Sequence, residues 1–268
     1  MQKTIQIAIE AARAAGAIQR ERLGKVRQID YKSAFNLVTD VDKAAEALII
    51  ETITAAFPDD SFLAEESGVT AGNAKKQGKN GSKNRRWIID PLDGTTNYAH
   101  SYPFFCVSIA LEENDQVMVG VVYNAVAEEL FLAERGQGAT LNGEKIKVSS
   151  HDELGGSLLA TGFPPDTVSN INNNMESFRT LTNLCHGVRR DGSAALDLAF
   201  VASGRIDGFW ERKLSPWDIA AGALIVEEAG GKVTNLENGT LDMSSGHILA
   251  TNSRIHSQIV DVLKEIKN

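Results

Sequence analysis

The pattern of apolar segments changes near residue 150, and this change constrains the fold more than any other feature of the chain. Between Arg86 and Val148, apolar runs of strand length at 104–111, 116–124 and 128–134 follow one another with only turn residues between them, and Asn142-Gly143 is a hairpin signal. After residue 150, strand-like stretches alternate with helix-like stretches. The sequence therefore predicts an α+β half with an antiparallel sheet, residues 1–149, followed by a mixed α/β half, residues 150–268.

Helices are expected on both sides of this change. The N-terminal segment has the spacing of an amphipathic helix that ends near Gly24, and a second helix is expected from Thr39 or Asp40 to the stop at Phe57-Pro58. A polar hairpin, a short strand at 60–67 and a surface loop rich in Gly, Asn and Lys at 69–84 are predicted around the second helix. Further helices are expected near 170–184, from Ser193, from Trp217 and at the C-terminus.

Composition excludes several classes of protein. The formal net charge of −8 over 268 residues disfavours a nucleic-acid backbone binder and is compatible with a cation site. No apolar run is long enough for a membrane span, and the charged N-terminus is unlike a signal peptide, so a cytoplasmic protein is predicted. Cys106 and Cys185 are expected to be free thiols, and the five histidines lack zinc-type spacing.

The segment IIDPLDGTTNYAH, residues 88–100, brings two acids to the end of an apolar run. In a regular strand Asp90 and Asp93 would point to opposite faces, but Pro91 and Gly94 make a continued strand unfavourable, and a turn can bring both carboxylates to one side. Mg²⁺ prefers such oxygen ligands, and the Leu92 carbonyl lies between the two acids. Taken alone, the segment fits an ordinary turn as well as a metal site.

Other polar residues allow the same two interpretations. Glu65-Glu66 ends a predicted strand, Asp42 lies at a helix start, and Asp218 fits a capping box with Ser215. Gly192 and Ser193 precede a helix, where anions also bind, and Glu211 follows an apolar strand. Helix capping or surface exposure explains each of them separately.

Taken together, these segments resemble the inositol monophosphatase family, whose members are Mg²⁺-dependent, lithium-sensitive phosphomonoesterases. The resemblance rests on EES at 65–67, WIIDPLDGTTNYAH at 87–100 and WDIAAGALIVEEAGG at 217–231, with NLVTDVD at 36–42 and RRDGSAALDLAFVASGRIDGFWE at 189–211 in the same order. The resemblance covers nearly the whole chain. One difference is Asn36, at a position where Asp is also common in the family. It implies a layered αβαβα, sugar-phosphatase-like fold and a homodimer.

The resemblance also implies roles for individual residues. Catalysis would involve Glu65, with Thr95 and Asp42 orienting a metal-activated water. Metal ligands would be Glu65, Asp90, the Leu92 carbonyl, Asp93 and Asp218. Substrate contacts would come from Gly94, Thr95, Thr96, Gly192, Ser193, Ala194 and Glu211, and Lys32 and Glu66 would lie behind the metal ligands.

The activity implied is Mg²⁺-dependent hydrolysis of a small polyol phosphate, with myo-inositol monophosphate ranked first. Fructose 1,6-bisphosphate, histidinol phosphate and 3′-phosphoadenosine nucleotides are alternatives, since Glu211 suits polyol hydroxyls whereas Arg189, Arg190 or Lys213 would suit a second phosphate. A regulatory binding protein that keeps the fold without catalysis ranks lower, because the complete set of carboxylates is present. No nucleic-acid or membrane partner is expected.

Overall fold

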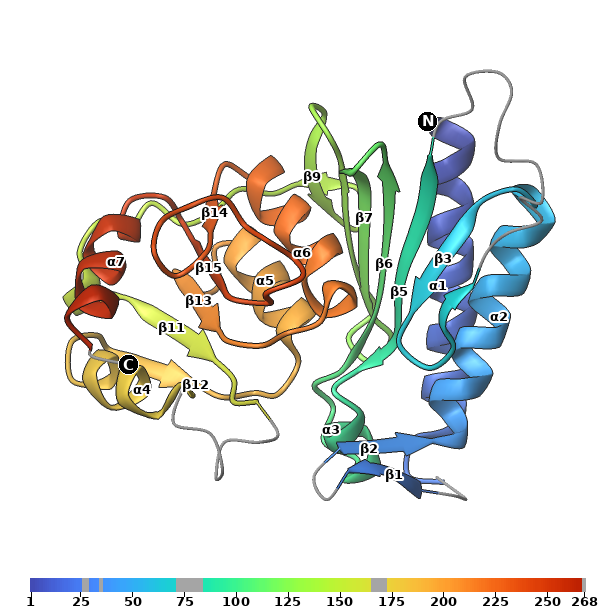
Figure 1. The fold of residues 1–268 in the computed structure, drawn as a ribbon, viewed down its shortest axis with the longest axis horizontal. Helices are drawn as coiled ribbons and strands as arrows, with labels where there is room; N and C mark the ends of the chain where they lie inside the picture. Colours follow the sequence, from blue (N-terminus) through green and yellow to red (C-terminus); the bar gives the residue numbers. More distant parts are fainter. Residues whose placement is uncertain (26–28, 34–35, 71–83, 165–172, 267–268) are drawn as a thin grey trace.

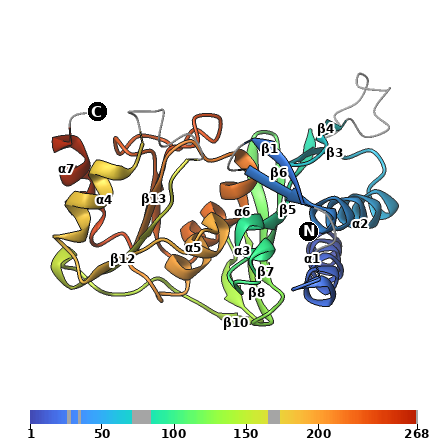
Figure 2. The ribbon, with the colours of Figure 1, turned by 90° about the horizontal axis from the view of Figure 1, so that it is seen from below.

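Helices and sheets alternate in five layers, as Figures 1 and 2 show for the computed structural model, which describes residues 1–25, 29–33, 36–70, 84–164 and 173–266. At residues 29, 31–33, 36 and 70 it describes the backbone alone. The layers are, in order, α1 (Gln2–Arg22) with α2 (Asp40–Ala56), an eight-stranded sheet, α5 (Ala194–Ala202) with α6 (Pro216–Glu228), a five-stranded sheet, and α4 (Met175–Thr182) with α7 (His256–Glu265). The predicted αβαβα layering is confirmed.

The larger sheet has the strand order β10-β9-β8-β7-β6-β5-β3-β4. Its strands are β3 (Ser61–Ala64), β4 (Gly68–Thr70), β5 (Arg85–Asp93), β6 (Cys106–Glu113), β7 (Gln116–Asn124), β8 (Glu129–Glu134), β9 (Gly138–Leu141) and β10 (Glu144–Lys145). Pairing from β5 to β10 is antiparallel throughout, as predicted, and Asn142-Gly143 joins β9 to β10. The predicted loop at 69–84 is wrong at its start, because Val69 and Thr70 pair with β3; residues 71–83 lie outside the described residues.

The smaller sheet is mixed, with the order β12-β11-β13-β15-β14. Its strands are β11 (Leu158–Thr161), β12 (Gly187–Arg189), β13 (Gly208–Glu211), β14 (Lys232–Thr234) and β15 (Ile248–Thr251). A short 3₁₀ turn (Leu154–Gly156) precedes it, and α4 covers part of the helix expected near 170–184, of which residues 170–172 lie outside the described residues. A division into separate units at residue 150 stays a prediction.

Strand β5 lies inside the larger sheet with both faces covered. Trp87 and Ile89 belong to the apolar cluster that α1 and α2 form on one face, whereas Ile88 belongs to the cluster beneath α5 and α6. Full burial of such side chains contributes about 1.5–3 kcal/mol each. This two-sided burial explains why the segment is an uninterrupted apolar run.

The expected turn at Pro91 is wrong, because β5 continues to Asp93. The register explains how. Asp90 pairs with Ser108 and Asp93 with Cys106, so the two residues between them on β5 lie opposite a single residue of β6. This irregularity is a β-bulge, which inserts one residue and shifts the alternation of faces. The bulge, rather than a turn, brings the two carboxylates to the same side.

A smaller group of elements lies at one end of the larger sheet. The predicted hairpin of Lys32 is β1 (Ile29–Ser33) with β2 (Asn36–Thr39), and α3 (Thr95–Ala99) follows β5 (Figure 1). A small apolar cluster of Val41, Leu92, Tyr98 and Phe105 joins the start of α2 to the end of β5. Both cysteines are free, as predicted. Among the described helices none has the length and apolar character needed to cross a membrane.

Candidate active site

Three carboxylates from two layers meet where β5 ends. Asp90 and Asp93 come from β5, and Asp218 comes from the first turn of α6. One oxygen of each lies within 4.8 Å of the others. Helix α6 is held there by the hydroxyl of Ser108, which donates to the Trp217 carbonyl at 3.1 Å. The arrangement provides three closely spaced oxygen ligands.

Burial and mutual repulsion make ionisation of all three acids unfavourable without a cation. Burial, followed by the charges of Glu65, Asp93 and Asp218, raises the pKa of Asp90 well above its usual value. Burial is also the main cause that raises the pKa of Asp93 to about 6 and that of Asp218 to about 8. A divalent cation would offset the repulsion, and hard cations prefer this all-oxygen ligand set. The residues therefore fit a site for a hard divalent cation.

Each acid of the cluster uses one oxygen to hold itself in place. Asp90 Oδ1 accepts the N–H of Leu92 at 2.9 Å, and Asp218 Oδ2 accepts the N–H of Ser215 at 2.7 Å. Asp93 Oδ2 accepts both the hydroxyl of Ser193 and the N–H of Ala195, each at 2.7 Å. These bonds fix the carboxylates before any ligand arrives and join the end of β5 to the start of α5.

Thr95 and Asp42 form a second polar pair beside the cluster. The Thr95 hydroxyl lies 3.0 Å from Asp42 Oδ1 and 3.1 Å from the Leu92 carbonyl, and it can donate to either. The other oxygen of Asp42 accepts the N–H and the hydroxyl of Thr39, at 2.8 and 2.5 Å, in a capping box at the start of α2. Burial is the main cause that raises the pKa of Asp42.

Gly94 allows the chain to turn sharply from β5 into α3. Its φ of +97° is in the region that favours glycine, and a Cβ there would lie 2.9 Å from the Phe104 carbonyl and 3.3 Å from the Gly192 carbonyl. Asn97 holds the next turn, because its Nδ2 donates to the carbonyls of Phe104 and Asp191, both at 2.7 Å. Gly94 and Gly192 are thus packed together across the two halves of the chain.

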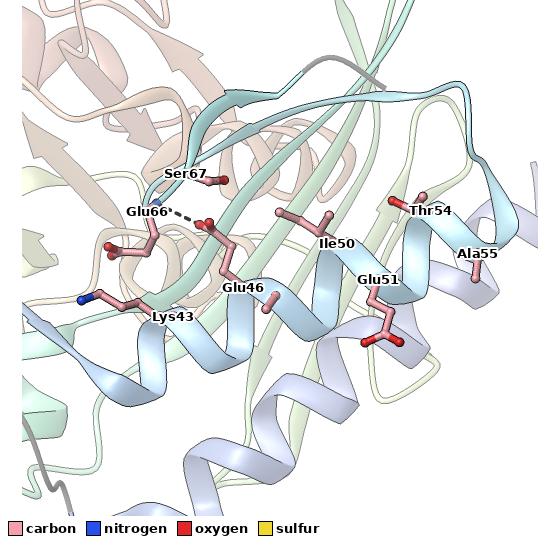
Figure 3. Close-up of a pocket in the computed structure, with 9 residues that line it drawn as sticks. Lys43, Glu46, Ile50, Glu51, Thr54, Ala55, Glu66 and Ser67 are labelled. Atoms are coloured by element: carbon pink, nitrogen blue, oxygen red, sulfur yellow. Dashed lines mark hydrogen bonds between the residues drawn. The ribbon is translucent and has the colours of Figure 1, made fainter. Parts of the chain in front are cut away.

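Glu65 follows β3 and lies near the same cluster, since its charge contributes to the raised pKa values of Asp90, Asp93 and Asp218, but it is not one of the three acids whose oxygens lie within 4.8 Å of one another. The next residue, Glu66, donates its N–H to Glu46 Oε2 on α2 at 2.8 Å (Figure 3). Lys32 lies in β1, but its side chain is outside the described residues.

The predicted substrate residues are divided between the two halves. Ser193 caps α5, and its hydroxyl donates to Asp93 instead of projecting freely; Ala194 is the first residue of that helix. Glu211, at the end of β13, is 8% exposed and packs so closely on Gly162 that a Cβ there would lie 2.2 Å from its Oε2. Thr96 is exposed on α3.

Three buried or bridging residues near the site were not predicted from the sequence. They are Glu46, Asn97 and Asp197. Asp197 is 2% exposed, and burial, together with Asp191, Glu211 and Asp93, raises its pKa well above the usual value. Only Glu46 had a usable signal, because it lies four residues after Asp42 and therefore on the same helix face.

Comparisons with known proteins identify the family of the chain. Residues 1–268 match the model of the inositol monophosphatase family. The chain is 50% identical over 264 residues to an inositol-1-monophosphatase of Synechocystis sp., covering 98% of this chain and 89% of the relative. It is 43% identical over 257 residues to the Nus factor SuhB of Escherichia coli, covering 95% and 93%. The solved inositol monophosphatase of Anabaena superposes with a TM-score of 0.88 at 48% identity, covering 99% and 97%. The chain is therefore a phosphatase and belongs to the inositol monophosphatase family.

Proposed function

We propose that this phosphatase hydrolyses the phosphate monoester of a small polyol in the presence of Mg²⁺, with myo-inositol monophosphate as its first-ranked substrate. The observation that carries the proposal is the cluster of Asp90, Asp93 and Asp218 with the Thr95–Asp42 pair beside it. Carboxylates in such proximity suit a cation, and a cation beside an oriented hydroxyl suits phosphate chemistry.

The residues that would hold the metal are Glu65, Asp90, the Leu92 carbonyl, Asp93 and Asp218. Bound Mg²⁺ supplies positive charge to the phosphate and lowers the pKa of a coordinated water. The Thr95 hydroxyl can donate to Asp42, which leaves its oxygen free to accept a proton from water. Asp42 is held by Thr39 at its other oxygen and can take up the proton that Thr95 passes on. Amides at Gly94 and Thr95, with Thr96 beside them, would contact the phosphate.

The alcohol side favours a substrate with hydroxyl groups. Glu211 is buried, and its neighbours Asp93, Asp197 and Asp218 are acids, whereas Arg190 supplies the opposing charge. Carboxylates accept hydrogen bonds from hydroxyls and repel a second phosphate, so fructose 1,6-bisphosphate ranks behind inositol monophosphate. A Staphylococcus aureus relative, 28% identical with a TM-score of 0.78, has been solved with inositol monophosphate and with 2′AMP. Gly192, Ala194 and Ser193 would line this side.

A binding role beside catalysis is a second proposal, supported by the relatives that carry the name Nus factor SuhB at 41–43% identity. It would give the chain a transcription-related partner. We also propose that the protein forms a homodimer, is located in the cytoplasm and is inhibited by lithium.

The deciding experiment is a phosphate-release panel. Inositol monophosphate, fructose 1,6-bisphosphate, histidinol phosphate and 3′-phosphoadenosine 5′-phosphate are each assayed with Mg²⁺ and with EDTA, using an Asp93→Asn variant as the matched control. We expect the highest kcat/KM with inositol monophosphate, no turnover in EDTA and a loss of several orders of magnitude in the variant. Turnover of none of the four substrates would leave the binding role as the better proposal.

A further inference from the structure

Helix α2 carries a second buried carboxylate one turn after Asp42. Glu46 is 4% exposed, and its Oε2 accepts the backbone N–H of Glu66, twenty residues away in the sequence, at 2.8 Å. Residues four apart lie on the same face of a helix, so Asp42 and Glu46 both face the end of the larger sheet. The proposed chemistry uses Asp42 but gives Glu46 no role.

The amide that Glu46 binds lies on one side of a proposed metal ligand. On the other side, the N–H of Glu65 donates to the Ile89 carbonyl of β5 at 3.1 Å. The N–H of Glu65 belongs to the peptide group before this residue, and the N–H of Glu66 belongs to the peptide group after it. The dihedral angles φ and ψ of Glu65 describe the rotation between these two planar groups. Fixing both peptide groups fixes the direction in which the Glu65 side chain leaves the backbone.

Glu65 belongs to a tight turn that the sheet alone does not hold. Strand β3 ends at Ala64, which pairs with Ile89 of β5 and with Gly68 of β4, and residues 65–67 connect the two strands of this edge hairpin. Figure 3 shows Glu46 reaching from α2 to Glu66 in that turn, with Lys43 one turn before it. The contact thus ties the turn to the helix that also carries Asp42.

We propose that Glu46 is a positioning residue, which fixes the turn after β3 and thereby directs Glu65 at the carboxylates of Asp90 and Asp93. The inference rests on the proposed metal-dependent function and deepens it. Through Asp42 and Glu46, α2 then places both the proton acceptor beside Thr95 and the proposed ligand Glu65 near the metal cluster. Partners that orient metal ligands typically change metal affinity by about 10–100-fold when they are removed.

A purely structural role for Glu46 is the alternative, and the surroundings of the residue provide matched controls. Glu46 and Glu51 both line a groove of about 840 Å³ between α2 and the turn (Figure 3). Glu51 is exposed, Figure 3 shows its carboxylate pointing away from the turn, and a change there removes a charge from α2 without touching the Glu66 amide. Loss of a stabilising contact alone would lower the melting temperature in EDTA and leave metal affinity unchanged.

The test measures direct Mn²⁺ binding by the electron paramagnetic resonance signal of the free ion, using the full chain without substrate. Glu46→Leu should weaken Mn²⁺ binding about tenfold or more, whereas Glu46→Gln, which keeps an acceptor oxygen, and Glu51→Leu should stay close to the parent. Glu46→Asp keeps the charge but shortens the reach, and it should fall between Gln and Leu, which keeps the test open if Glu46→Leu does not fold. Parent-like Mn²⁺ binding by Glu46→Leu, or by Glu46→Asp where Glu46→Leu does not fold, would overturn the proposal.

Kinetics provide the second readout. In Glu46→Leu the Mg²⁺ concentration for half-maximal turnover should rise about tenfold, while KM for inositol monophosphate at saturating Mg²⁺ should stay within about twofold. An increase in KM without a change in the Mg²⁺ requirement would contradict positioning through Glu65. Because Mn²⁺ binding needs no substrate, an inactive parent would refute the proposed function and leave this test of Glu46 intact.

Discussion

Replacing Asp93 by asparagine should separate the stability of the metal-free fold from its ability to bind metal. The Asn side chain keeps one oxygen that can accept from Ser193 and Ala195, as Asp93 Oδ2 does now at 2.7 Å. It removes one negative charge from a cluster in which burial and the charge of Glu65 oppose ionisation. The metal-free variant should therefore be more stable than the parent above pH 6, although it has lost a proposed ligand.

The magnitude follows from the raised pKa of Asp93. A shift from 3.8 to about 6 corresponds to about 3 kcal/mol at 1.36 kcal/mol per pKa unit. This is an upper limit, because Asp90 or Asp218 can bind the proton instead. The sign is that of an acid whose pKa is higher in the folded state: the cost is absent below about pH 4, grows as the pH rises to about 6 and is complete above that. The stability gained by Asp93→Asn should grow over the same interval.

Urea unfolding in EDTA at pH 4, 6 and 8 measures this gain, and thermal melting with added Mg²⁺ measures the loss of the ligand. The parent should gain stability with Mg²⁺ as RT ln(1 + [Mg²⁺]/Kd), whereas the variant should gain much less. Lower stability of the variant in EDTA at pH 8 would show that burial of the charged Asp93 carboxylate does not destabilise the metal-free fold. An equal Mg²⁺-induced shift in both proteins would refute the placement of the metal at Asp93.

Three further changes test other parts of the structure. Thr95→Val should lower kcat by about 10²–10⁴-fold, which is the range for the loss of a positioned acid–base group. Mn²⁺ binding should be retained, and Thr95→Ser should stay largely active. A normal kcat in Thr95→Val would exclude Thr95 from proton transfer. Gly94→Ala should destabilise the fold by about 1–3 kcal/mol, because φ is +97° and the Phe104 carbonyl lies 2.9 Å from the added Cβ. The loss should appear as a lower midpoint of urea unfolding. An unchanged midpoint would show that the turn can relax. His256 is buried between the hydroxyls of Thr234 and Thr251, and burial lowers its pKa to about 4. The parent should therefore lose stability as the pH falls from about 6.5 towards 4, and His256→Gln should lose less. Matching pH profiles of the two proteins in urea unfolding would contradict this assignment.

Much of the fold could be predicted from the sequence because its signals are local. The Asn142-Gly143 turn, the cap at Thr39 and the stop at Phe57-Pro58 each act within a few residues, and the structure contains the hairpin and the helix that they predict. The apolar run before Asp90 is a strand, since a central strand is covered on both faces. These local residue patterns were therefore sufficient to predict whether most segments form a helix or a strand.

The bulge in β5 was beyond the reach of such signals. Pro91 and Gly94 correctly indicate irregular backbone, but Pro91 is tolerated in the strand because the register with β6 shifts between Asp90 and Asp93. The register shift is defined by the pairing with β6, so Pro91 and Gly94 alone could not show that the strand continues to Asp93. Contacts such as Ser193 with Asp93 or Glu46 with Glu66 join residues 100 and 20 positions apart, and they depend on how the layers pack.

The capping and the functional interpretations of the acids turn out to be compatible, for a geometric reason. Asp42 and Asp218 are both third residues of helices, and each uses Oδ2 to accept the N–H of the residue that precedes the helix. A carboxylate has two oxygens, so capping leaves Oδ1 of Asp42 available for Thr95 and leaves a second oxygen on Asp218, which belongs to the cluster with Asp90 and Asp93. Because the cap fixes the rotamer, the free oxygen is held in one direction without further contacts. Asparagine at either position would keep the acceptor for the cap and lose the charge, so we expect such variants to fold and to fail in metal binding or proton transfer.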